Sequence, residues 1–343
     1  MICIYSDNHK KHRSPFEVFN GDHDTAQEVP ERVATIKSAL RKNEVECRLN
    51  TKTVSRKLLE KVHLKKYLNF LEDTSRSLGK GEYQYPSVYP YTNIHSNSYP
   101  YGLSAIARRG LYCFDTYTPI LRHTYEAAIS SASLAFEAAV SIKDNPKENF
   151  YALCRPPGHH AEPAMSGGYC YINNAAVASE YLSEFGRVTV LDIDFHHGNG
   201  TQQIFYERPD VMTVSLHADP KYRFPFFTGF KEERGIGKGL GKNINFPLKL
   251  GINNKGYCTV LDKALDEIAI FKTDFLVVAY GADTHEKDPI GGMKLTTDYY
   301  RQMASNIKSL SVPTIVIQEG GYNTSELGNV VTSFLKGFSK NEK

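Results

Sequence analysis

The fold of this chain is decided by residues 187–200, which read RVTVLDIDFHHGNG. The first half is a run of β-branched and aliphatic residues, which is typical of a buried parallel strand. The second half changes abruptly to carboxylates and imidazoles and then breaks at two glycines. Because side chains alternate along a strand, Asp192, Asp194 and His196 would point to one side if the chain stays extended.

Two aspartates and two histidines at the end of an apolar strand are costly to bury. Unpaired charges in such a place would destabilise the fold strongly. A divalent metal ion removes this cost, because Asp oxygen and His nitrogen are both good ligands for first-row metals. The alternative is a set of capping and loop residues at a strand end, without chemistry.

The composition of the 343 residues is that of an ordinary globular protein, with 41% hydrophobic and 23% charged residues. The net charge of +3 is too small to indicate binding to nucleic acid or to a membrane. The six cysteines are scattered without zinc-finger or redox spacing, which favours a reducing compartment. Since neither a signal-peptide pattern nor a membrane-spanning apolar run occurs, we expect a cytoplasmic protein.

Short apolar runs alternate with helical patterns along the chain. Strands are predicted at 2–5, 45–49, 150–154, 187–192, 211–216, 243–246, 274–280 and 312–318, and helices at about 31–41, 55–73 and 126–143. This alternation predicts an α/β fold. We expect a single domain over residues 1–343 with three layers: a mostly parallel eight-stranded sheet and helices on both of its faces.

Residues 82–101 differ from the rest, because they contain six tyrosines and three prolines. The prolines exclude a regular helix, and so many tyrosines argue against disorder. Tyrosine offers apolar area with one polar tip and is enriched at interfaces. We interpret the segment as an ordered insertion that contacts a partner subunit or walls a site; a loop packed on its own domain is the alternative.

Four of the predicted strands each run into a cluster of polar residues and glycines. These clusters are 155–160, 192–200, 281–283 and 319–322. In parallel sheets, sites lie beyond the carboxyl ends of the strands, so the four clusters should meet at one edge. A single cluster would mean little, since strand ends commonly carry Gly and Asp, but four at the same edge predict a functional site.

The chemistry of these side chains suggests roles. Asp194, His196 and Asp283 offer three protein ligands and leave positions open for water and substrate, as in catalytic zinc sites. His159 and His160 are adjacent neutral bases that can act on a metal-bound water.

Each of these two histidines needs a partner on its other ring nitrogen to fix its tautomer. Asp192 and Asn199 are the candidates, one for each histidine. Tyr322, which follows two glycines, can donate a hydrogen bond to a developing oxyanion. Together these parts predict hydrolysis of an amide or ester by metal-activated water.

These motifs resemble those of the histone deacetylase superfamily, which has the arginase/deacetylase fold. The resemblance covers the chain from about residue 120 and rests on residues 155–161, 167–176, 192–200, 215–217, 281–283 and 320–322. It implies a zinc-dependent deacetylase with one catalytic Zn²⁺ ion, whose ligands would be Asp194, His196 and Asp283.

The resemblance also implies roles for the residues around the metal. His160 matches the general base and acid of the family, and His159 matches its electrostatic partner. Tyr322 matches the residue that polarises the acyl carbonyl. Tyr169 and Phe224 match the two aromatic walls of the narrow substrate tunnel, next to Gly168.

A structural K⁺ ion is implied as well. Its ligands would come from Asp192, Asp194, His196, Ser215 and Leu216. Phe205, Arg208 and Val211 would fall at a second potassium site.

Within the family, the chain looks like the acetylpolyamine amidohydrolase branch. Its residue 199 is Asn, where eukaryotic class I enzymes have an aspartate. The insertion at 82–101 looks like the loop that helps to form a dimer and narrows the active-site mouth in that branch. Glu17 falls where a family carboxylate meets the distal ammonium of the substrate. The resemblance thus implies a small cationic acetylated amine as substrate and a homodimer as assembly.

Three hypotheses follow. The first is a zinc deacetylase that acts on acetylated polyamines, with local carboxylates such as Glu17 supplying the attraction that the net charge does not. The second is a deacylase of acetyl-lysine in proteins or peptides, or of longer acyl groups, with the same site and a wider mouth. The third is an inactive or sugar-binding-like scaffold, which the complete set of ligands, histidines and tyrosine disfavours. Arginase-like chemistry would need further Asp and His ligands for two manganese ions.

Overall fold

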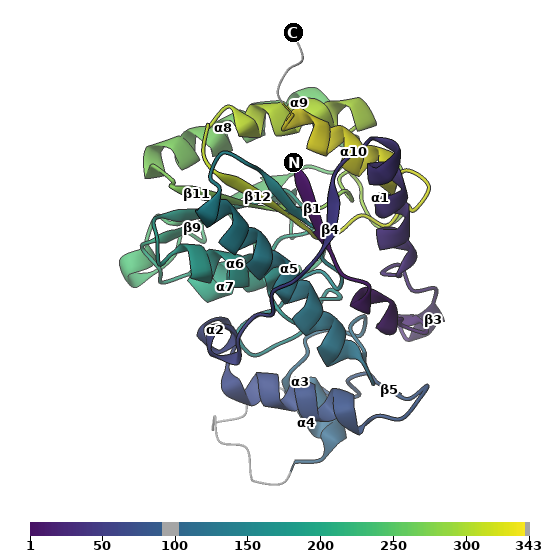
Figure 1. The fold of residues 1–343 in the computed structure, drawn as a ribbon. Coiled ribbons are helices and arrows are strands. Elements are labelled where there is room, and N and C mark those ends of the chain that lie inside the picture. Colours follow the sequence, from purple (N-terminus) through teal and green to yellow (C-terminus); the bar gives the residue numbers. More distant parts are fainter. Residues whose placement is uncertain (91–102, 340–343) are drawn as a thin grey trace.

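The computed structural model describes residues 1–90 and 103–339 (Figure 1). At its centre lies an eight-stranded sheet in the order β10-β9-β8-β11-β12-β7-β1-β4, in which every neighbouring pair is parallel. The strands are β1 (Ile2–Tyr5), β4 (Cys47–Leu49), β7 (Phe150–Ala152), β8 (Val188–Asp192), β9 (Val211–Ala218), β10 (Asn243–Leu248), β11 (Phe275–Tyr280) and β12 (Thr314–Gln318). The predicted fold class and all eight predicted strands are confirmed.

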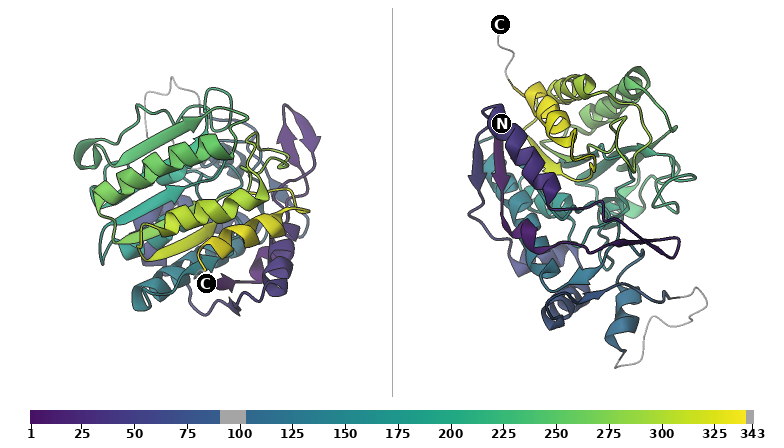
Figure 2. Two further views of the ribbon diagram at one scale, coloured as in Figure 1. Left: turned by 90° about the horizontal axis from the view of Figure 1, so that it is seen from above. Right: turned by 90° about the vertical axis from the view of Figure 1, so that its right-hand side faces the viewer.

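Helices cover both faces of this sheet, as Figures 1 and 2 show. One face is covered by α1 (Glu31–Lys42), α8 (Asn254–Phe271), α9 (Thr297–Lys308) and α10 (Leu327–Gly337). The other is covered by α2 (Arg56–Val62), α3 (Lys65–Ser77), α5 (Thr124–Asp144) and α6 (Asn174–Leu182). The remaining helices are α4 (Ala105–Leu111), α7 (Asn199–Phe205) and the short 3₁₀ turns η1 (Asn8–Lys11) and η2 (Gly237–Gly239).

The alternation of side chains along the central strands divides the core into two halves. On β11, Leu276 and Val278 face the layer of α8 to α10, whereas Val277 and Ala279 face the layer of α5 and α6. Both faces of the sheet are therefore buried, which explains why the central strands read as continuous apolar runs.

Several helices begin where the local sequence supplies a cap. The side chains of Ser55, Asn173 and Asn253 each accept a hydrogen bond from a backbone N–H in the first turn of α2, α6 and α8. Such caps satisfy donors that have no partner inside the helix. Asn173 Nδ2 also donates to Ala161 O at 3.2 Å, so the cap residue ties α6 to the loop that follows β7.

The predicted helix at 55–73 is in fact two helices, α2 and α3. The backbone is extended at His63 and Leu64. The break leaves the His63 ring free to bond outward: its Nδ1 lies 2.9 Å from the carbonyl oxygen of Glu162, and its Nε2 accepts from Asn173 N at 2.9 Å. Local helical periodicity is therefore overridden by tertiary contacts of His63 with the loop that precedes α6.

Two small antiparallel sheets of two strands each lie outside the central sheet. One joins β2 (Glu17–Phe19) to β3 (Asp22–Asp24), and the other pairs β5 (Tyr83–Gln84) with β6 (Ile120–Leu121). Only the pair of β2 and β3 is a hairpin, and it lies in the polar segment that follows β1, for which the sequence predicted no strands.

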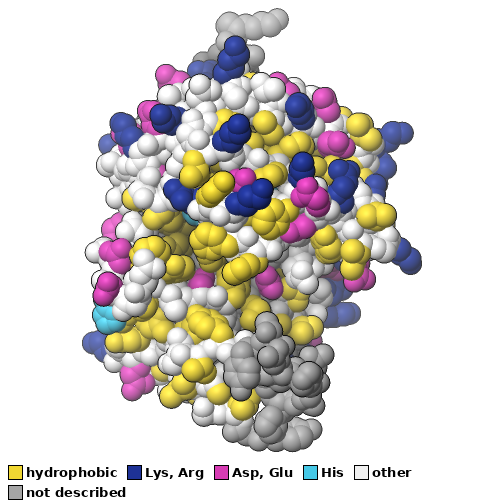
Figure 3. Space-filling model, turned by 180° about the vertical axis from the view of Figure 1, so that it is seen from behind, with side chains coloured by type: hydrophobic (Ala, Val, Ile, Leu, Met, Phe, Trp, Pro, Cys, Tyr) yellow, Lys and Arg dark blue, Asp and Glu magenta, His cyan; other side chains and the backbone are white. Residues whose placement is uncertain are grey.

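The surface agrees with the modest net charge. On the face drawn in Figure 3, hydrophobic side chains gather across the middle, and most Lys and Arg side chains lie toward the top and the edges. Among the described residues, no helix is both long and apolar enough to span a bilayer.

Candidate active site

The four strands that lead into polar clusters are neighbours in the sheet, in the order β8-β11-β12-β7. Since they are parallel, their carboxyl ends lie at one edge, and the clusters that follow them meet there. Gly320 N, after β12, donates to Asp194 Oδ2, after β8, at 2.8 Å. Gly158 N, after β7, donates to Glu319 Oε2 at 2.6 Å. The structure thus brings the predicted clusters together.

The three predicted metal ligands form one compact group. A ligand atom from each of Asp194, His196 and Asp283 lies within 4.8 Å of the others. His196 Nδ1 is 3.1 Å from Asp283 Oδ2 and 3.4 Å from Asp194 Oδ1. Both carboxylates are buried.

These residues converge through turns and not through an extended strand. Strand β8 ends at Asp192, and the chain bends at 194–196. Asp192 Oδ1 accepts from Asp194 N at 3.1 Å, and Asp194 Oδ1 accepts from His196 N at 2.8 Å. Aspartates often stabilise turns in this way. The alternation expected for an extended strand therefore stops at Asp192.

The surroundings of the two carboxylates fit a bound cation. Burial, together with the nearby charge of Asp194, raises the pKa of Asp283 to about 7. A Cβ atom at Gly320 would lie 2.5 Å from Asp283 Oδ2 and 2.6 Å from Asp194 Oδ2, so glycine keeps the space beside the carboxylates clear. Two carboxylates and one imidazole are a suitable donor set for a divalent first-row metal with open coordination positions.

Each of the two adjacent histidines has its own partner. His159 Nδ1 lies 3.0 Å from Asp192 Oδ2, and His160 Nδ1 lies 2.8 Å from Asn199 Oδ1. The centroids of the two imidazole rings are 4.0 Å apart. In both residues the partner occupies Nδ1, which leaves Nε2 for other contacts.

The different partners pull the pKa values of the two histidines apart. Burial alone would lower the pKa of His159, but the carboxylates of Asp194 and Asp192 outweigh burial and raise this pKa to about 10. Burial lowers the pKa of His160 well below its usual value, and the neighbouring imidazoles of His159 and His196 add to the effect. Such a pair can provide one cationic and one neutral imidazole in the same place.

A cavity of about 240 Å³ opens onto these groups. It is lined by Glu17, Phe19, Asp24, Gln27, Tyr117, His160, Gly168, Tyr169, His196, Phe224, Ile290 and Tyr322. All four residues predicted to bind substrate and the predicted oxyanion donor are therefore in its wall. Among the described residues, no Lys or Arg lines this cavity.

Aromatic rings form part of the cavity wall next to His160 and Tyr322. The Phe224 ring centroid is 4.9 Å from that of His160, and the Tyr169 and Tyr322 centroids are 5.7 Å apart. Gly168 has a φ of +54°, and a Cβ atom there would lie 2.2 Å from His160 Cδ2. Only glycine allows this close approach without displacing the imidazole.

Tyr322 is fixed from two sides. Its backbone N donates to Asp288 Oδ2 at 2.7 Å. The guanidinium carbon of Arg32 lies 4.8 Å from the centroid of its ring, and Arg32 Nε donates to Gly321 O at 2.6 Å. The tyrosine is thus positioned beside the triad by residues that the sequence did not single out.

Glu17 begins strand β2 and is 8% exposed. Its carboxylate accepts hydrogen bonds from Gln27 N at 2.6 Å and from the Tyr169 hydroxyl at 3.0 Å. Burial raises the pKa of Glu17 to about 7. An acid group therefore lies in the wall of the cavity, as the resemblance implied.

Several residues of the cavity wall were not predicted. Phe19 and Asp24 come from the hairpin of β2 and β3, whose turn consists of Asn20 and Gly21 with φ angles of 51° and 90°. An Asn-Gly dipeptide is a strong hairpin signal and could have revealed this element. Tyr117, Gln27 and Ile290 come from loops in which no sequence pattern marked them.

A further carboxylate lies beneath the histidines. Glu319 is fully buried and accepts from both Gly158 N and His159 N, at 2.6 and 3.2 Å. Burial raises its pKa to about 7. It lies in one of the four predicted clusters, yet nothing in the sequence distinguished it from a residue at an ordinary strand end.

Potassium binding remains a prediction. Asp192 and Ser215 are neighbours in the register of β8 and β9, and both line a small internal cavity. At the second predicted site, Phe205 and Val211 are buried. The Arg208 side chain there is paired with Glu180 and Asp210, each at 2.7 Å.

The Tyr/Pro insertion is only partly described, because its residues 91–101 lie outside the described ranges. In the described part, Tyr85 stacks on Phe16 with centroids 5.2 Å apart. Since Phe16 adjoins Glu17, this part of the insertion packs against the segment that carries the acidic wall of the cavity.

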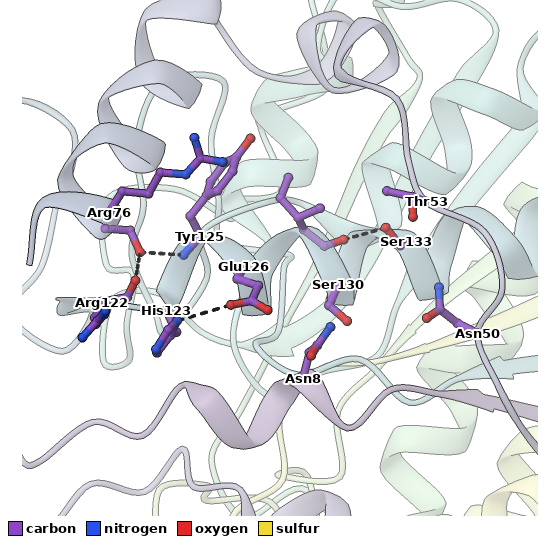
Figure 4. A pocket seen from close by; sticks show the side chains of 12 residues that line it. Asn8, Asn50, Thr53, Arg76, Arg122, His123, Tyr125, Glu126, Ser130 and Ser133 are labelled. Atoms are coloured by element: carbon purple, nitrogen blue, oxygen red, sulfur yellow. Dashed lines mark hydrogen bonds and ion pairs between the residues drawn. The ribbon is translucent and has the colours of Figure 1, made fainter. Parts of the chain in front are cut away.

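A larger cavity of about 550 Å³ lies at the start of α5, away from these groups (Figure 4). Its polar side chains are largely engaged with one another or with the backbone. Glu126 lies 3.3 Å from the His123 imidazole, and Ser130 Oγ donates to Ser6 Oγ at 2.8 Å. None of the described residues in its wall belongs to a group of three or more potential metal ligands.

The fold and the site together define a class: an α/β protein with a candidate metal centre beyond the carboxyl ends of a parallel sheet. Comparison with known proteins identifies the family. The profile of the histone deacetylase domain matches residues 26–338. The chain belongs to the histone deacetylase family.

Three relatives illustrate the similarity. Acetylpolyamine amidohydrolase 1 of Pseudomonas aeruginosa is 36% identical over 98% of this chain and 99% of its own. Acetylpolyamine amidohydrolase of Mycoplana ramosa is 39% identical, with coverages of 98% and 99%. The crystal structure of acetylpolyamine aminohydrolase from Burkholderia pseudomallei has a TM-score of 0.92, with 35% identity and 98% of each chain covered.

Proposed function

We propose that this deacetylase removes acetyl groups from acetylated polyamines by hydrolysis at a zinc site formed by Asp194, His196 and Asp283. The observation that carries the proposal is a cavity lined at once by His160, His196 and a buried acid, Glu17, with no Lys or Arg in the described part of its wall. Such a cavity suits a slender chain with an amide at one end and a cation at the other.

A divalent metal bound by the triad would supply Lewis acidity, polarising the acetyl carbonyl and lowering the pKa of a water. The rest of the chemistry belongs to the protein. His160, kept neutral by burial and oriented by Asn199, accepts the proton of the attacking water at Nε2. The same histidine then donates this proton to the departing amine nitrogen.

His159 carries the opposite charge state. Its hydrogen bond to Asp192 favours the imidazolium, which stabilises the negative charge that develops as water attacks. The Tyr322 hydroxyl donates to the oxygen of the acetyl group as that oxygen becomes an oxyanion. Burial and nearby negative charge raise the pKa of Tyr322 well above its usual value, so this hydroxyl keeps its proton.

The far end of the substrate would meet Glu17. A primary or secondary ammonium of the substrate would shift Glu17 toward its ionised form, because a nearby positive charge favours the carboxylate. Relatives that carry the name acetylpolyamine amidohydrolase support the substrate class. We also propose that the protein is a homodimer formed through residues 82–101.

The test is acetate release from N-acetylputrescine, acetylspermidine and an acetyl-lysine peptide by the zinc-loaded protein. Strong preference for the small amines is the expected result. Preference for the peptide would replace the polyamine proposal with lysine deacetylation at a wider mouth. Equal inactivity on all three, with zinc bound in stoichiometric amount, would reject both.

A further inference from the structure

We infer that Asp24 is a second carboxylate for substrate recognition, which binds the outer ammonium of substrates with two free amines. This inference rests on the proposed function and refines its substrate class. It concerns the outer part of the cavity, beyond Glu17, where the hairpin of β2 and β3 forms the wall.

The register of this hairpin places the two carboxylates next to each other. Glu17 and Asp24 are direct partners across the antiparallel pair. Direct partners point to the same face of a hairpin, with Cβ atoms about 5 Å apart. Both residues line the cavity of the active site, so their common face is the one that the substrate meets.

The two positions differ in depth. Glu17 is buried, whereas Asp24 is exposed at the mouth. Asp24 Oδ1 accepts from Thr25 N at 2.7 Å, which restrains the orientation of its carboxylate. A chain that leaves the metal site therefore meets first a buried acid and then a solvated one.

Two aromatic side chains at this hairpin also belong to the cavity wall. Phe19 and Tyr117 stack with ring centroids 6.2 Å apart, and both line the cavity. Aromatic faces attract alkylammonium groups and also contact the methylenes between them. The wall thus offers acidic and aromatic groups to a cationic chain.

A polyamine has the matching shape. N-Acetylputrescine has one ammonium, four carbons from its amide nitrogen. N⁸-Acetylspermidine has the same arm and continues with a three-carbon spacer to a second ammonium. If Glu17 binds the ammonium that both substrates have, the second ammonium of N⁸-acetylspermidine lies farther out. Its three-carbon spacer is about as long as the distance between directly paired residues of two strands.

The experiment compares kcat/KM for these two substrates in the zinc-loaded wild type and in Asp24→Asn. The substitution should lower kcat/KM for N⁸-acetylspermidine about threefold to fivefold through KM, the range of a solvated ion pair. It should leave N-acetylputrescine nearly unchanged. The loss should shrink at high salt, because an exposed pair is screened.

Asp22→Asn is the matched control, since Asp22 is an exposed carboxylate of the same strand that does not line the cavity. It removes the same charge and should not change the ratio of the kcat/KM values for the two substrates. Equal losses for both substrates in Asp24→Asn, or the same change of ratio in Asp22→Asn, would overturn the inference and leave the proposed function intact. Absence of wild-type turnover on both amines would reject the proposed function, and the inference with it.

Discussion

At the scale of single residues, identical side chains gain different properties from their neighbours. His159 and His160 are adjacent in sequence, but one lies against the carboxylate of Asp192 and the other against the amide of Asn199. The sequence predicted that each histidine would have one of these two residues as its partner. It could not predict the opposite pKa shifts, because those depend on the burial of each imidazole and on the approach of the Asp194 carboxylate to His159 in the folded protein.

Tyr322→Phe should reduce turnover by about two or three orders of magnitude while KM changes little, since the hydroxyl is needed mainly in the transition state. Steady-state acetate release measures both constants. Tyr280→Phe is a suitable control, because the buried Tyr280 hydroxyl has no hydrogen-bond partner among the described residues. An unchanged rate in Tyr322→Phe would reject the oxyanion role.

Asp283→Ala should lose bound zinc along with activity, because it removes one of three protein ligands. Metal content after gel filtration, measured by atomic emission, provides a readout that is independent of turnover. Asp288→Asn removes a nearby carboxylate that contacts the Tyr322 backbone and is outside the triad, and it should retain the metal. Stoichiometric zinc in Asp283→Ala would contradict the ligand set.

Glu17 should make substrate affinity depend on pH. Burial raises its pKa to about 7 in the free protein, so the carboxyl gains its charge as pH rises through neutrality. A cationic substrate prefers the ionised form, and its KM should therefore fall as pH rises from about 6 to about 8. In Glu17→Gln this pH dependence of KM should vanish. Identical pH profiles of KM in the two proteins would exclude Glu17 from recognition.

At the scale of elements, the strands were easier to predict than the segments between them. Each central strand is buried on both faces and therefore appears as an apolar run. The hairpin of β2 and β3 has no such run: both strands have three residues, and β3 is exposed throughout. Its role depends on lying beside the cavity, a long-range relation that local pattern does not contain. Consequently Glu17 was found only by resemblance, and Asp24 was not found.

Helix α1 contributes a buried ionic network behind the site. Glu28 Oε1 lies 2.9 Å from Arg32 Nη1 and 2.8 Å from Arg155 Nε, and all three side chains are almost fully buried. Arg32 also donates to the backbone before Tyr322, and Arg155 Nη1 donates to the carbonyl oxygens of His9 and His12. The network therefore joins the first loop, α1 and the loop after β12.

Glu28→Gln should lower the free energy of unfolding by about 3–5 kcal/mol, because it leaves two buried guanidinium groups without their counter-ion. Denaturant unfolding monitored by circular dichroism measures the change. The exposed pair of Glu31 with Arg13 offers the control: Glu31→Gln should cost less than about 1 kcal/mol. Similar losses of unfolding free energy in both variants would show that the buried network contributes no more to stability than the exposed pair.

The same network should affect stability in acid. Burial alone would raise the pKa of Glu28, but Arg155 and Arg32 outweigh it and lower the pKa below 4.5. A carboxyl whose pKa is lower in the folded than in the unfolded state stabilises the fold at pH values above its unfolded-state pKa. This contribution is lost as the pH falls through its folded-state pKa. The stability difference between wild type and Glu28→Gln should therefore narrow below about pH 4.5.

At the scale of the whole molecule, the site exists because four strands with separate clusters are neighbours in the sheet. Their order in the sheet, β8-β11-β12-β7, differs from their order in the chain. The general rule that sites lie beyond the carboxyl ends of parallel strands was enough to predict that the clusters meet. It could not supply the distances, which arise from the turns after β8 and from glycines such as Gly168 and Gly320.

Assembly is the remaining prediction at this scale. Replacing residues 91–101 by a Gly/Ser sequence of equal length keeps the contact of Tyr85 with Phe16 and removes Tyr91, Tyr99 and Tyr101. If these tyrosines form the interface, light scattering should give a mass near 38.6 kDa for the variant and twice that for the wild type. An unchanged thermal unfolding temperature at low protein concentration would show that the fold survives. A variant that remains a dimer would exclude Tyr91, Tyr99 and Tyr101 from the interface and assign it to other residues.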